Sequence, residues 1–343
     1  MIEKLRIERF KSIQTLEIPC KKVNMFIGAP DTGKTNMLEA LYFLSRMGWR
    51  LPIDFSLRLR DDIGLEALYY RQFIDQSFLI SLDMAHPYIH GNYKNISIQV
   101  KFVASSLHLK LLVNTETGQT SLGENAAFNQ AFSFPNYFNW IRFYSYVSSG
   151  NWTYDSGGQF GTEVVTPPEG RNLMYIARHN EKVYQFLIDI LKGLNWKLRF
   201  DQSHRTFRFS EVKENEIFDY NIDLLSDSLK RLFFYSAIIL TSQNVTLVFD
   251  EPDVFAFPPY PKILGEMIAD DESNQFFLTT HNPYFLSAVV EKTPIDNLAL
   301  FVCYRNKDGS TGAKLLSKQE VEKVIEQGQN VFFNLDEFLT EDT

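Results

Sequence analysis

The segment FIGAPDTGKT, residues 26–35, constrains the fold of this chain more than any other part of its sequence. Gly28 to Thr35 satisfies the pattern G-x-x-x-x-G-K-[ST]. A mostly apolar run, VNMFI, precedes the motif, and apolar residues with helical spacing follow it from Thr35 until Gly48. The motif therefore lies between a predicted strand and a predicted helix, the context in which it forms a phosphate-binding loop.

The residue types in this loop suit the phosphates of a nucleotide. Gly28 and Gly33 let backbone N–H groups turn inward at the positive end of the helix, and Lys34 places a charge on the β- and γ-phosphates. The Thr35 hydroxyl is a ligand for Mg²⁺. The alternative is a glycine turn that matches by chance. We expect the nucleotide to contact the loop and the start of the helix, namely Gly28, Ala29, Pro30, Asp31, Thr32, Gly33, Lys34, Thr35 and Asn36.

Two adjacent carboxylates end a second apolar strand, VTLVFDEPD (245–253). Burying this strand would place Asp250 and Glu251 at its C-terminal edge, where α/β sheets bind ligands. We expect Asp250 to hold Mg²⁺ through water. Glu251 is then the candidate general base for attack on the γ-phosphate, because phosphoryl transfer requires mainly positioning and charge. The alternative is an ordinary turn at a strand end.

Polar residues also follow the next apolar strand, QFFLTTHNP (275–283). His281 would emerge at the same edge of the sheet and is a candidate to bind and sense the γ-phosphate. It could instead cap the helix that starts near Pro283. In LLSDSLKR (224–231), Ser226 and Asp227 begin another helix. They either cap that helix or face a γ-phosphate bound by a second subunit.

The rest of the chain predicts an α/β protein in which short apolar strands alternate with helices, the pattern of a mostly parallel sheet covered by helices. A helix is expected over 172–194, followed by a hairpin. Three strands within 77–113 and a turn cluster at 114–120 indicate an inserted β-rich region. The Gly- and Ser-rich segment 148–170 predicts a surface loop. The expected division is 1–48, the first part of a nucleotide-binding lobe; 49–146, the insert; 147–222, loop, helix and hairpin; and 223–343, the second lobe.

Composition limits the kinds of partner and compartment. The formal net charge is −8, which disfavours a protein that coats nucleic acid over its whole surface. Two isolated cysteines and the lack of an apolar stretch of roughly 20 residues favour a cytoplasmic protein. The basic residues have two interpretations: they contact DNA through a local basic patch, or they are scattered solvated charges. The candidates are Lys11, Lys21 and Lys22 near the N-terminus, and Lys192, Lys197 and Arg199 around the start of the predicted hairpin.

Taken in order, these motifs resemble the ATP-binding-cassette ATPases of the SMC, RecF and OLD group. LRIERFKSIQTLEI and the loop with its helix resemble the opening of such ATPases, DEPDVFAFPPY their Walker B motif and D-loop, LLSDSLKR their signature motif, and TTHNP their switch histidine segment. PPEGRNLMYI is similar to a segment of the compact members. The resemblance implies a P-loop NTPase with a mixed sheet core, and ATP with Mg²⁺ held between two chains of a head-to-tail homodimer. Lys34, Glu251 and His281 would act in one chain and Ser226 in the other.

The chain also departs from the family in three places. Ser228 stands where the signature motif usually has glycine, Asp31 brings a carboxylate to the phosphate loop, and Phe255–Pro258 replaces a histidine-containing segment. No heptad run separates Lys34 from Asp250, so we expect no coiled-coil arm. The residues after His281 are too few for a Toprim nuclease domain of roughly 100 residues.

The sequence therefore predicts a compact ATPase that acts in DNA transactions or phage defence with a separate effector protein of the nuclease or toxin type. A regulatory scaffold or antitoxin-like component with slow or lost hydrolysis is the alternative, favoured by Asp31 and Ser228. A P-loop kinase or GTPase is disfavoured by the DEPD and TTHNP segments and by the lack of an N-K-x-D motif.

Overall fold

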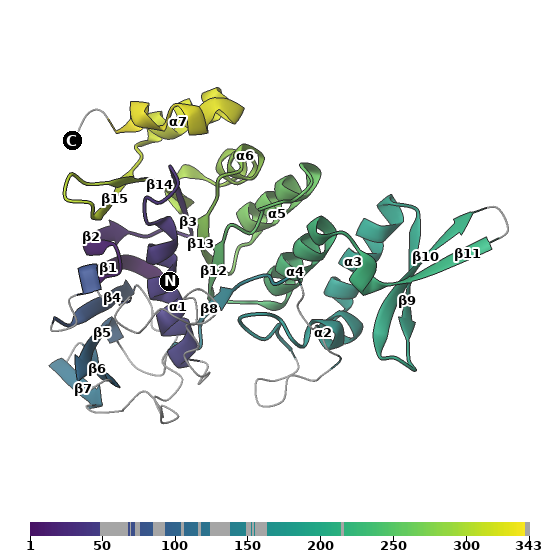
Figure 1. Ribbon diagram of the computed structural model, residues 1–343, viewed down its shortest axis with the longest axis horizontal. Helices are drawn as coiled ribbons and strands as arrows, with labels where there is room; N and C mark the ends of the chain where they lie inside the picture. Colours follow the sequence, from purple (N-terminus) through teal and green to yellow (C-terminus); the bar gives the residue numbers. More distant parts are fainter. Residues whose placement is uncertain are drawn as a thin grey trace.

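The computed structural model describes residues 1–48, 68, 70–72, 76–84, 93–103, 106–115, 118–123, 138–148, 152, 154, 163–213 and 216–339. Within this part of the chain, two six-stranded sheets lie in the main body, and a three-stranded sheet projects from one side (Figure 1). Among the helices described, none combines the length and apolar content that a membrane crossing requires.

The central sheet carries the predicted motifs at the ends of its strands. It is parallel except for the pairing of its last two strands, β14 and β15. Its spatial order is β15 (Thr311–Leu315), β14 (Leu298–Arg305), β3 (Val23–Gly28), β13 (Gln275–Thr279), β12 (Thr246–Asp250) and β8 (Ile141–Tyr144). All residues of β3 and β13 are buried, which explains their mainly apolar sequences. The prediction of a mostly parallel sheet is confirmed.

Helices cover this sheet. They are α1 (Lys34–Gly48), α4 (Asp227–Thr241), α5 (Pro259–Asp270), α6 (Pro283–Lys292) and α7 (Lys318–Gln327), with 3₁₀ turns η6 (Ile295–Asn297), η7 (Gly328–Phe333) and η8 (Leu335–Phe338) near the C-terminus. Helix α1 packs on β8 and β12, α5 packs between α4 and α6, and α6 contacts α7 (Figure 1). Most residues of α4 are buried, because it is apolar on nearly every side.

The second six-stranded sheet is antiparallel throughout. Its order is β2 (Ile13–Pro19), β1 (Ile2–Phe10), β4 (Phe78–Met84), β5 (Tyr93–Val103), β6 (Ser106–Thr115) and β7 (Gly118–Gly123). The short 3₁₀ turn η3 (Tyr70–Gln72) lies before β4. Residues 49–146, expected to form one insert, thus contribute β4–β7 to this sheet and β8 to the central one. The expected turn at 114–120 is wrong for Asn114 and Thr115, which belong to β6, and for Gly118–Thr120, which belong to β7.

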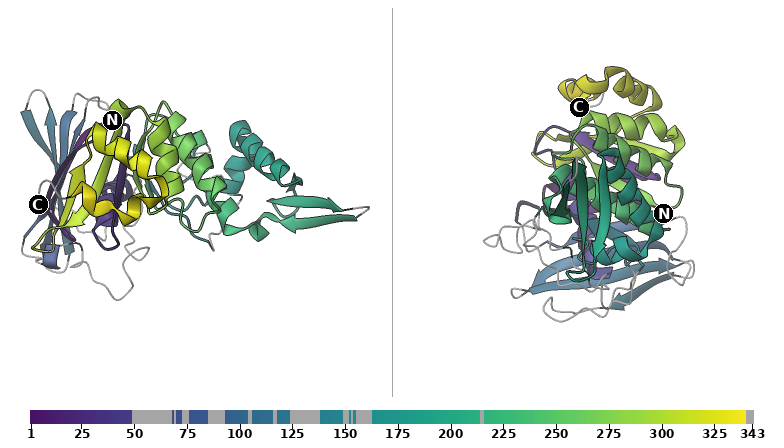
Figure 2. Two further views of the ribbon diagram at one scale, coloured as in Figure 1. Left: turned by 90° about the horizontal axis from the view of Figure 1, so that it is seen from above. Right: turned by 90° about the vertical axis from the view of Figure 1, so that its right-hand side faces the viewer.

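The projecting arm contains α2 (Leu173–His179), α3 (Glu181–Gly193) and the antiparallel strands β9 (Trp196–Asp201), β10 (Thr206–Lys213) and β11 (Glu216–Asn221), followed by η5 (Ile222–Leu224) (Figures 1 and 2). The hairpin prediction is confirmed, but the single helix over 172–194 is wrong. Asn180 has extended dihedrals, φ −104° and ψ 112°, and its side chain accepts a hydrogen bond from Val183 N. It therefore ends α2 and caps α3. Most of the loop expected at 148–170 lies outside the described residues.

Candidate functional site

The loop between β3 and α1 has the backbone conformation that its glycines permit. Gly28 and Gly33 have φ values of +154° and +91°. A Cβ atom on Gly28 would lie 2.5 Å from the carbonyl oxygen of Cys303, and one on Gly33 would lie 2.8 Å from Ser12 Oγ. Asp31 is also left-handed, at φ +61°. The loop is therefore wrapped tightly against β14 and the β1–β2 turn, and only glycine fits at its two ends.

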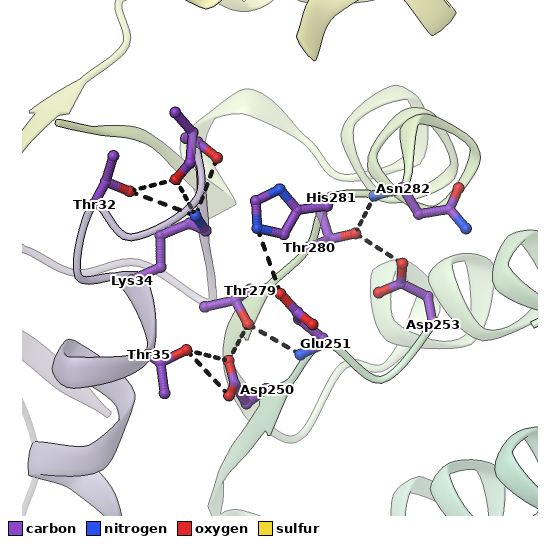
Figure 3. Close-up of polar contacts among 12 residues, drawn as sticks. Thr32, Lys34, Thr35, Asp250, Glu251, Asp253, Thr279, Thr280, His281 and Asn282 are labelled. Atoms are coloured by element: carbon purple, nitrogen blue, oxygen red, sulfur yellow. Dashed lines mark hydrogen bonds and ion pairs between the residues drawn. The ribbon is translucent and has the colours of Figure 1, made fainter. Parts of the chain in front are cut away.

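The ammonium group of Lys34 lies inside this loop. Its Nζ donates to the carbonyl oxygens of Gly28 at 3.0 Å and Ala29 at 2.7 Å (Figure 3). Thr32 Oγ1 donates to the same Ala29 oxygen at 2.9 Å. Burial lowers the pKa of Lys34, although nearby carboxylates oppose the shift. The ammonium group is thus held by two backbone carbonyl oxygens of the loop, and the oxygens of an anion could replace them as its partners.

The carboxylate of Asp250 lies against the first turn of α1. Thr35 Oγ1 is 3.3 Å and 3.4 Å from its two oxygens. Thr279, at the end of β13, donates its hydroxyl to Asp250 Oδ1 and accepts a hydrogen bond from Glu251 N at 3.0 Å (Figure 3). One threonine hydroxyl therefore fixes Asp250 and the backbone of Glu251 together. The structure brings Thr35 and Asp250, the two residues expected to hold Mg²⁺, into contact.

The oxygen atoms of Thr35 and Asp250 are suitable ligands for Mg²⁺. This ion is commonly held by one or two carboxylates, with water and substrate phosphates completing its octahedron. Among the described residues, no group of three or more His, Cys, Asp and Glu side chains forms a complete protein-only metal site. A hydroxyl and a carboxylate beside a phosphate-binding loop therefore fit a metal ion shared with a phosphate ligand.

Glu251 and His281 face each other across the same edge of the sheet. His281 Nε2 lies 3.4 Å from Glu251 Oε1, and both side chains are partly exposed (Figure 3). Burial lowers the pKa of His281 and the Lys34 ammonium acts in the same direction, while the nearby carboxylates oppose the shift. The capping role considered for His281 belongs to Asn282, whose side chain accepts from the N–H groups of Tyr284 and Phe285.

A second pair of contacts ties the loop after β12 to the segment after β13. Thr280 Oγ1 donates to Asp253 Oδ2 at 2.9 Å and accepts from Asn282 N at 2.9 Å (Figure 3). Asp253 is 3% exposed, and burial raises its pKa to about 7. Asp253 was not among the predicted site residues, although its position two residues after Glu251 was a visible signal. The contact holds the backbone on either side of His281 against the loop that carries Glu251.

Lys34, Thr35, Glu251 and His281 line the same cavity of about 360 Å³. Its lining residues are Pro30, Asp31, Gly33, Lys34, Thr35, Asn36, Glu251, His281 and Arg305. Arg305 is the member that the sequence did not indicate, because only the pairing of β14 with β3 brings it beside the loop. A larger cavity of about 730 Å³ lies beside α2 and α3 and contains none of the predicted site residues.

Three predicted residues have other contacts within the chain. Asn36 lines the cavity, yet its Nδ2 donates to Ser12 Oγ at 2.6 Å. Ser226 caps α4 by accepting from Leu229 N. Asp227 accepts hydrogen bonds from the hydroxyls of Tyr146 and Ser148; burial opposes its ionisation, but these contacts hold its pKa below the ordinary value. Neither Ser226 nor Asp227 lines the cavity of its own chain.

The hydroxyl of Ser228 bridges α4 to the loop after β12. Its Oγ donates to the carbonyl oxygen of Phe255 at 3.0 Å and accepts from Phe257 N at 3.1 Å. Both phenylalanines are exposed, Phe255 at 88% and Phe257 at 61%. The serine that departs from the family pattern is therefore used within the chain to hold two aromatic side chains at the surface.

The candidate DNA-contacting residues do not gather in one patch. Lys11 forms a largely buried ion pair with Glu39 at 2.6 Å, and Lys21 Nζ donates to Ile295 O at 2.8 Å. Arg199 pairs with Asp219 at 2.6 Å on the projecting arm, on the opposite side of the molecule from the N-terminus (Figure 1). The two groups of basic residues thus lie apart, and Lys11 and Arg199 are each paired with a carboxylate.

Comparison with known proteins gives both a family and a fold. Residues 1–246 match the family model described as AAA ATPase domain. No curated protein sequence matches the chain. The crystal structure of an SMC head bound to the C-terminal winged-helix domain of ScpA has a TM-score of 0.59 and 13% identity, covering 94% of this chain and 99% of that one. An Smc head with an extended coiled coil, bound to the C-terminal domain of ScpA from Pyrococcus furiosus, has a TM-score of 0.53 and 14% identity, covering 95% and 98%. The fold is that of an SMC-type head.

Proposed function

This chain belongs to the AAA ATPase domain family, and we propose that it binds ATP with Mg²⁺ in the 360 Å³ cavity and hydrolyses it. One observation carries the proposal. The hydroxyl of Thr279 joins Asp250, a candidate metal ligand beside Thr35, to the backbone of Glu251, a candidate base beside His281. This contact places the two carboxylates at one strand edge, facing the phosphate loop.

The reaction would use this chain's groups in separate roles. Lys34 exchanges its carbonyl contacts for phosphate oxygens, and the loop amides hold the phosphates at the start of α1. Mg²⁺ held by Thr35 and Asp250 would neutralise phosphate charge. Glu251 accepts a proton from the attacking water, and neutral His281 orients Glu251 and contacts the γ-phosphate. Hydrolysis thus depends mainly on positioning and charge, as expected for phosphoryl transfer.

Loss of Lys34 tests whether this cavity is the ATP site. We expect Lys34→Ala to abolish binding of a fluorescent ATP analogue in the presence of Mg²⁺, together with phosphate release. Lys262→Ala, which changes an exposed lysine of α5, is the matched control and should bind as the wild type does. Unchanged affinity in Lys34→Ala would refute the proposed site.

The active form in this proposal is a head-to-tail homodimer in which Ser226 meets the γ-phosphate of its partner. Ser226 and Asp227 lie at the start of α4 and outside the cavity of their own chain. Exposed apolar side chains surround this helix start. Leu224 is 69% exposed, and Ser228 holds the segment Phe255–Phe257, here called the aromatic loop. Such a surface suits contact with a second subunit.

We further propose that the dimer acts in DNA transactions or phage defence through a separate effector of the nuclease or toxin type. The matched SMC heads are bound to domains of ScpA, a separate protein. The projecting arm offers an attachment surface remote from the cavity, with Ile217 71% exposed. Co-purification of the intact chain, followed by identification of the bound protein, tests this step. A chain that purifies alone from its native cell, with and without ATP, would contradict it.

A slow or inactive regulatory scaffold is the second candidate function. Two observations favour it: the Asp31 carboxylate in the phosphate loop and the engagement of Ser228 within its own chain. ATP binding and dimer formation without measurable phosphate release would support the scaffold, whereas turnover that depends on Glu251 would exclude it.

A further inference from the structure

Arg305 ends β14 beside the phosphate loop and is held there by backbone oxygens. Its Nε donates to the carbonyl oxygen of Asp31 at 2.7 Å, and its Nη1 donates to that of Gly309 at 3.1 Å. Asp31 belongs to the phosphate loop and Gly309 to the turn between β14 and β15. These two contacts fix the guanidinium plane at the wall of the cavity. Among the described residues, no carboxylate forms an ion pair with it.

The charges around the cavity explain why a second cation is needed there. Asp31 and Glu251 line it and Asp250 lies beside Lys34, so three carboxylates surround the place where a polyphosphate would bind. Lys34 is one cation, and burial lowers its pKa. An arginine keeps its charge at every physiological pH, and its planar set of N–H donors matches the oxygens of a phosphate group.

We propose that Arg305 is a phosphate-binding residue for the nucleoside triphosphate, and that it offsets the charge of Asp31. The inference rests on the proposed ATP site and adds one phosphate-binding residue to it. The guanidinium that compensates the carboxylate of Asp31 is anchored by the backbone carbonyl oxygen of the same residue. The unusual acid of the loop and the cation of β14 therefore form one unit, contributed by two segments far apart in the sequence.

The experiment measures the dissociation constant of ATP with Mg²⁺ for the intact chain. Arg305→Gln removes the charge and should weaken binding about 10- to 100-fold, the range for hydrogen bonds to a charged group. Arg305→Lys keeps the charge and should recover part of this loss. Asp31→Asn should reduce the effect of Arg305→Gln when the two changes are combined, because the repulsive carboxylate is then absent.

Arg71, in η3, provides a matched control because it contacts the same β14–β15 turn. It donates to the carbonyl oxygen of Asp308, next to Gly309, but it does not line the cavity. Arg71→Gln should therefore bind ATP as the wild type does, which separates support of the turn from contact with phosphate. If Arg305→Gln binds within twofold of the wild type, or if Arg305→Lys loses as much as Arg305→Gln, the inference is wrong.

Lys34→Ala keeps this inference distinct from the proposed function. If Lys34→Ala still binds ATP normally, the site itself has been misplaced, and both proposals fail. If Lys34→Ala loses ATP binding while Arg305→Gln keeps it, the ATP site stands and only the role of Arg305 is refuted.

Discussion

His281 Nε2 lies 3.4 Å from Glu251 Oε1, and the two side chains come from segments that follow neighbouring parallel strands. Burial lowers the pKa of His281, which favours the neutral imidazole over a permanent ion pair with Glu251. A neutral ring can orient the carboxylate and still leave it free to accept a proton.

Replacement of His281 should therefore reduce turnover more than binding. We expect His281→Ala to lower the rate of phosphate release at least about tenfold, with the ATP dissociation constant changed much less. Wild-type turnover should fall at acidic pH, below the range in which an ordinary histidine titrates, because the lowered pKa of His281 delays its protonation and the charged imidazole then forms an ion pair with Glu251. The variant should lack this part of the pH profile. His204→Ala, in the β9–β10 turn, is the control, and equal turnover in both variants would contradict the assigned role.

The hydroxyl of Thr279 should matter for both stability and turnover. Thr279→Val keeps the shape of the side chain but leaves Glu251 N and Asp250 Oδ1 without their shared partner. We expect a loss of about 1–3 kcal/mol in the free energy of unfolding and a marked loss of phosphate release. Thr279→Ser retains the hydroxyl and should keep most of the turnover. A Thr279→Val protein that hydrolyses ATP at the wild-type rate would show that the bridge is not needed.

Asp253 should make the chain less stable as the pH rises. Its folded pKa is about 7, against roughly 3.9 in an unfolded chain. Between these values the folded state retains a proton that the unfolded state has lost, so stability falls with increasing pH across this window. Asp253→Asn keeps an acceptor for Thr280 and cannot ionise. In urea unfolding, the free energy of unfolding of this variant should rise relative to that of the wild type from pH 4 to pH 8. Asp296→Asn, at an exposed site, is the control, and a pH-independent difference for Asp253→Asn would refute the shift.

The aromatic loop should be required for the proposed dimer. Phe255 is 88% exposed and is held beside the start of α4 by Ser228. Phe255→Asp should prevent association in light scattering with ATP and Mg²⁺, because a charge would be buried at the interface. Binding of ATP to the single chain should be unaffected. Ile217→Asp, on the arm, should still dimerise. Dimerisation of Phe255→Asp to the wild-type extent would exclude this face.

The sequence predicted those parts of the fold in which a periodic apolar pattern ends at a polar motif. β3 with α1, and β12 and β13 with their polar ends, follow from buried runs that stop at Gly28, Asp250 and Thr279. The break at Asn180 was missed because apolar spacing continues across it while its side chain caps the second helix. β15 was missed because its sequence has little apolar alternation. α7 was also missed, although Ser317 and Glu320 form a capping box.

Within the candidate site, the limit of prediction was tertiary contact. The loop, Asp250, Glu251 and His281 could be placed together because the ends of neighbouring parallel strands meet at one edge. Arg305 could not, since its position depends on the register that pairs Cys303 with Gly28. The internal contacts of Ser228 were equally invisible, because they depend on how the loop after β12 folds back onto α4.

The most direct test of the account is ATP hydrolysis by Glu251→Gln. With saturating ATP and Mg²⁺, we expect phosphate release to fall about 10²- to 10⁴-fold relative to the wild type, because the amide cannot accept a proton from water. The variant should still bind ATP. Glu272→Gln, at an exposed position after α5, should hydrolyse ATP normally. Phosphate release by Glu251→Gln at the wild-type rate would contradict the central claim that Glu251 is the base of this site.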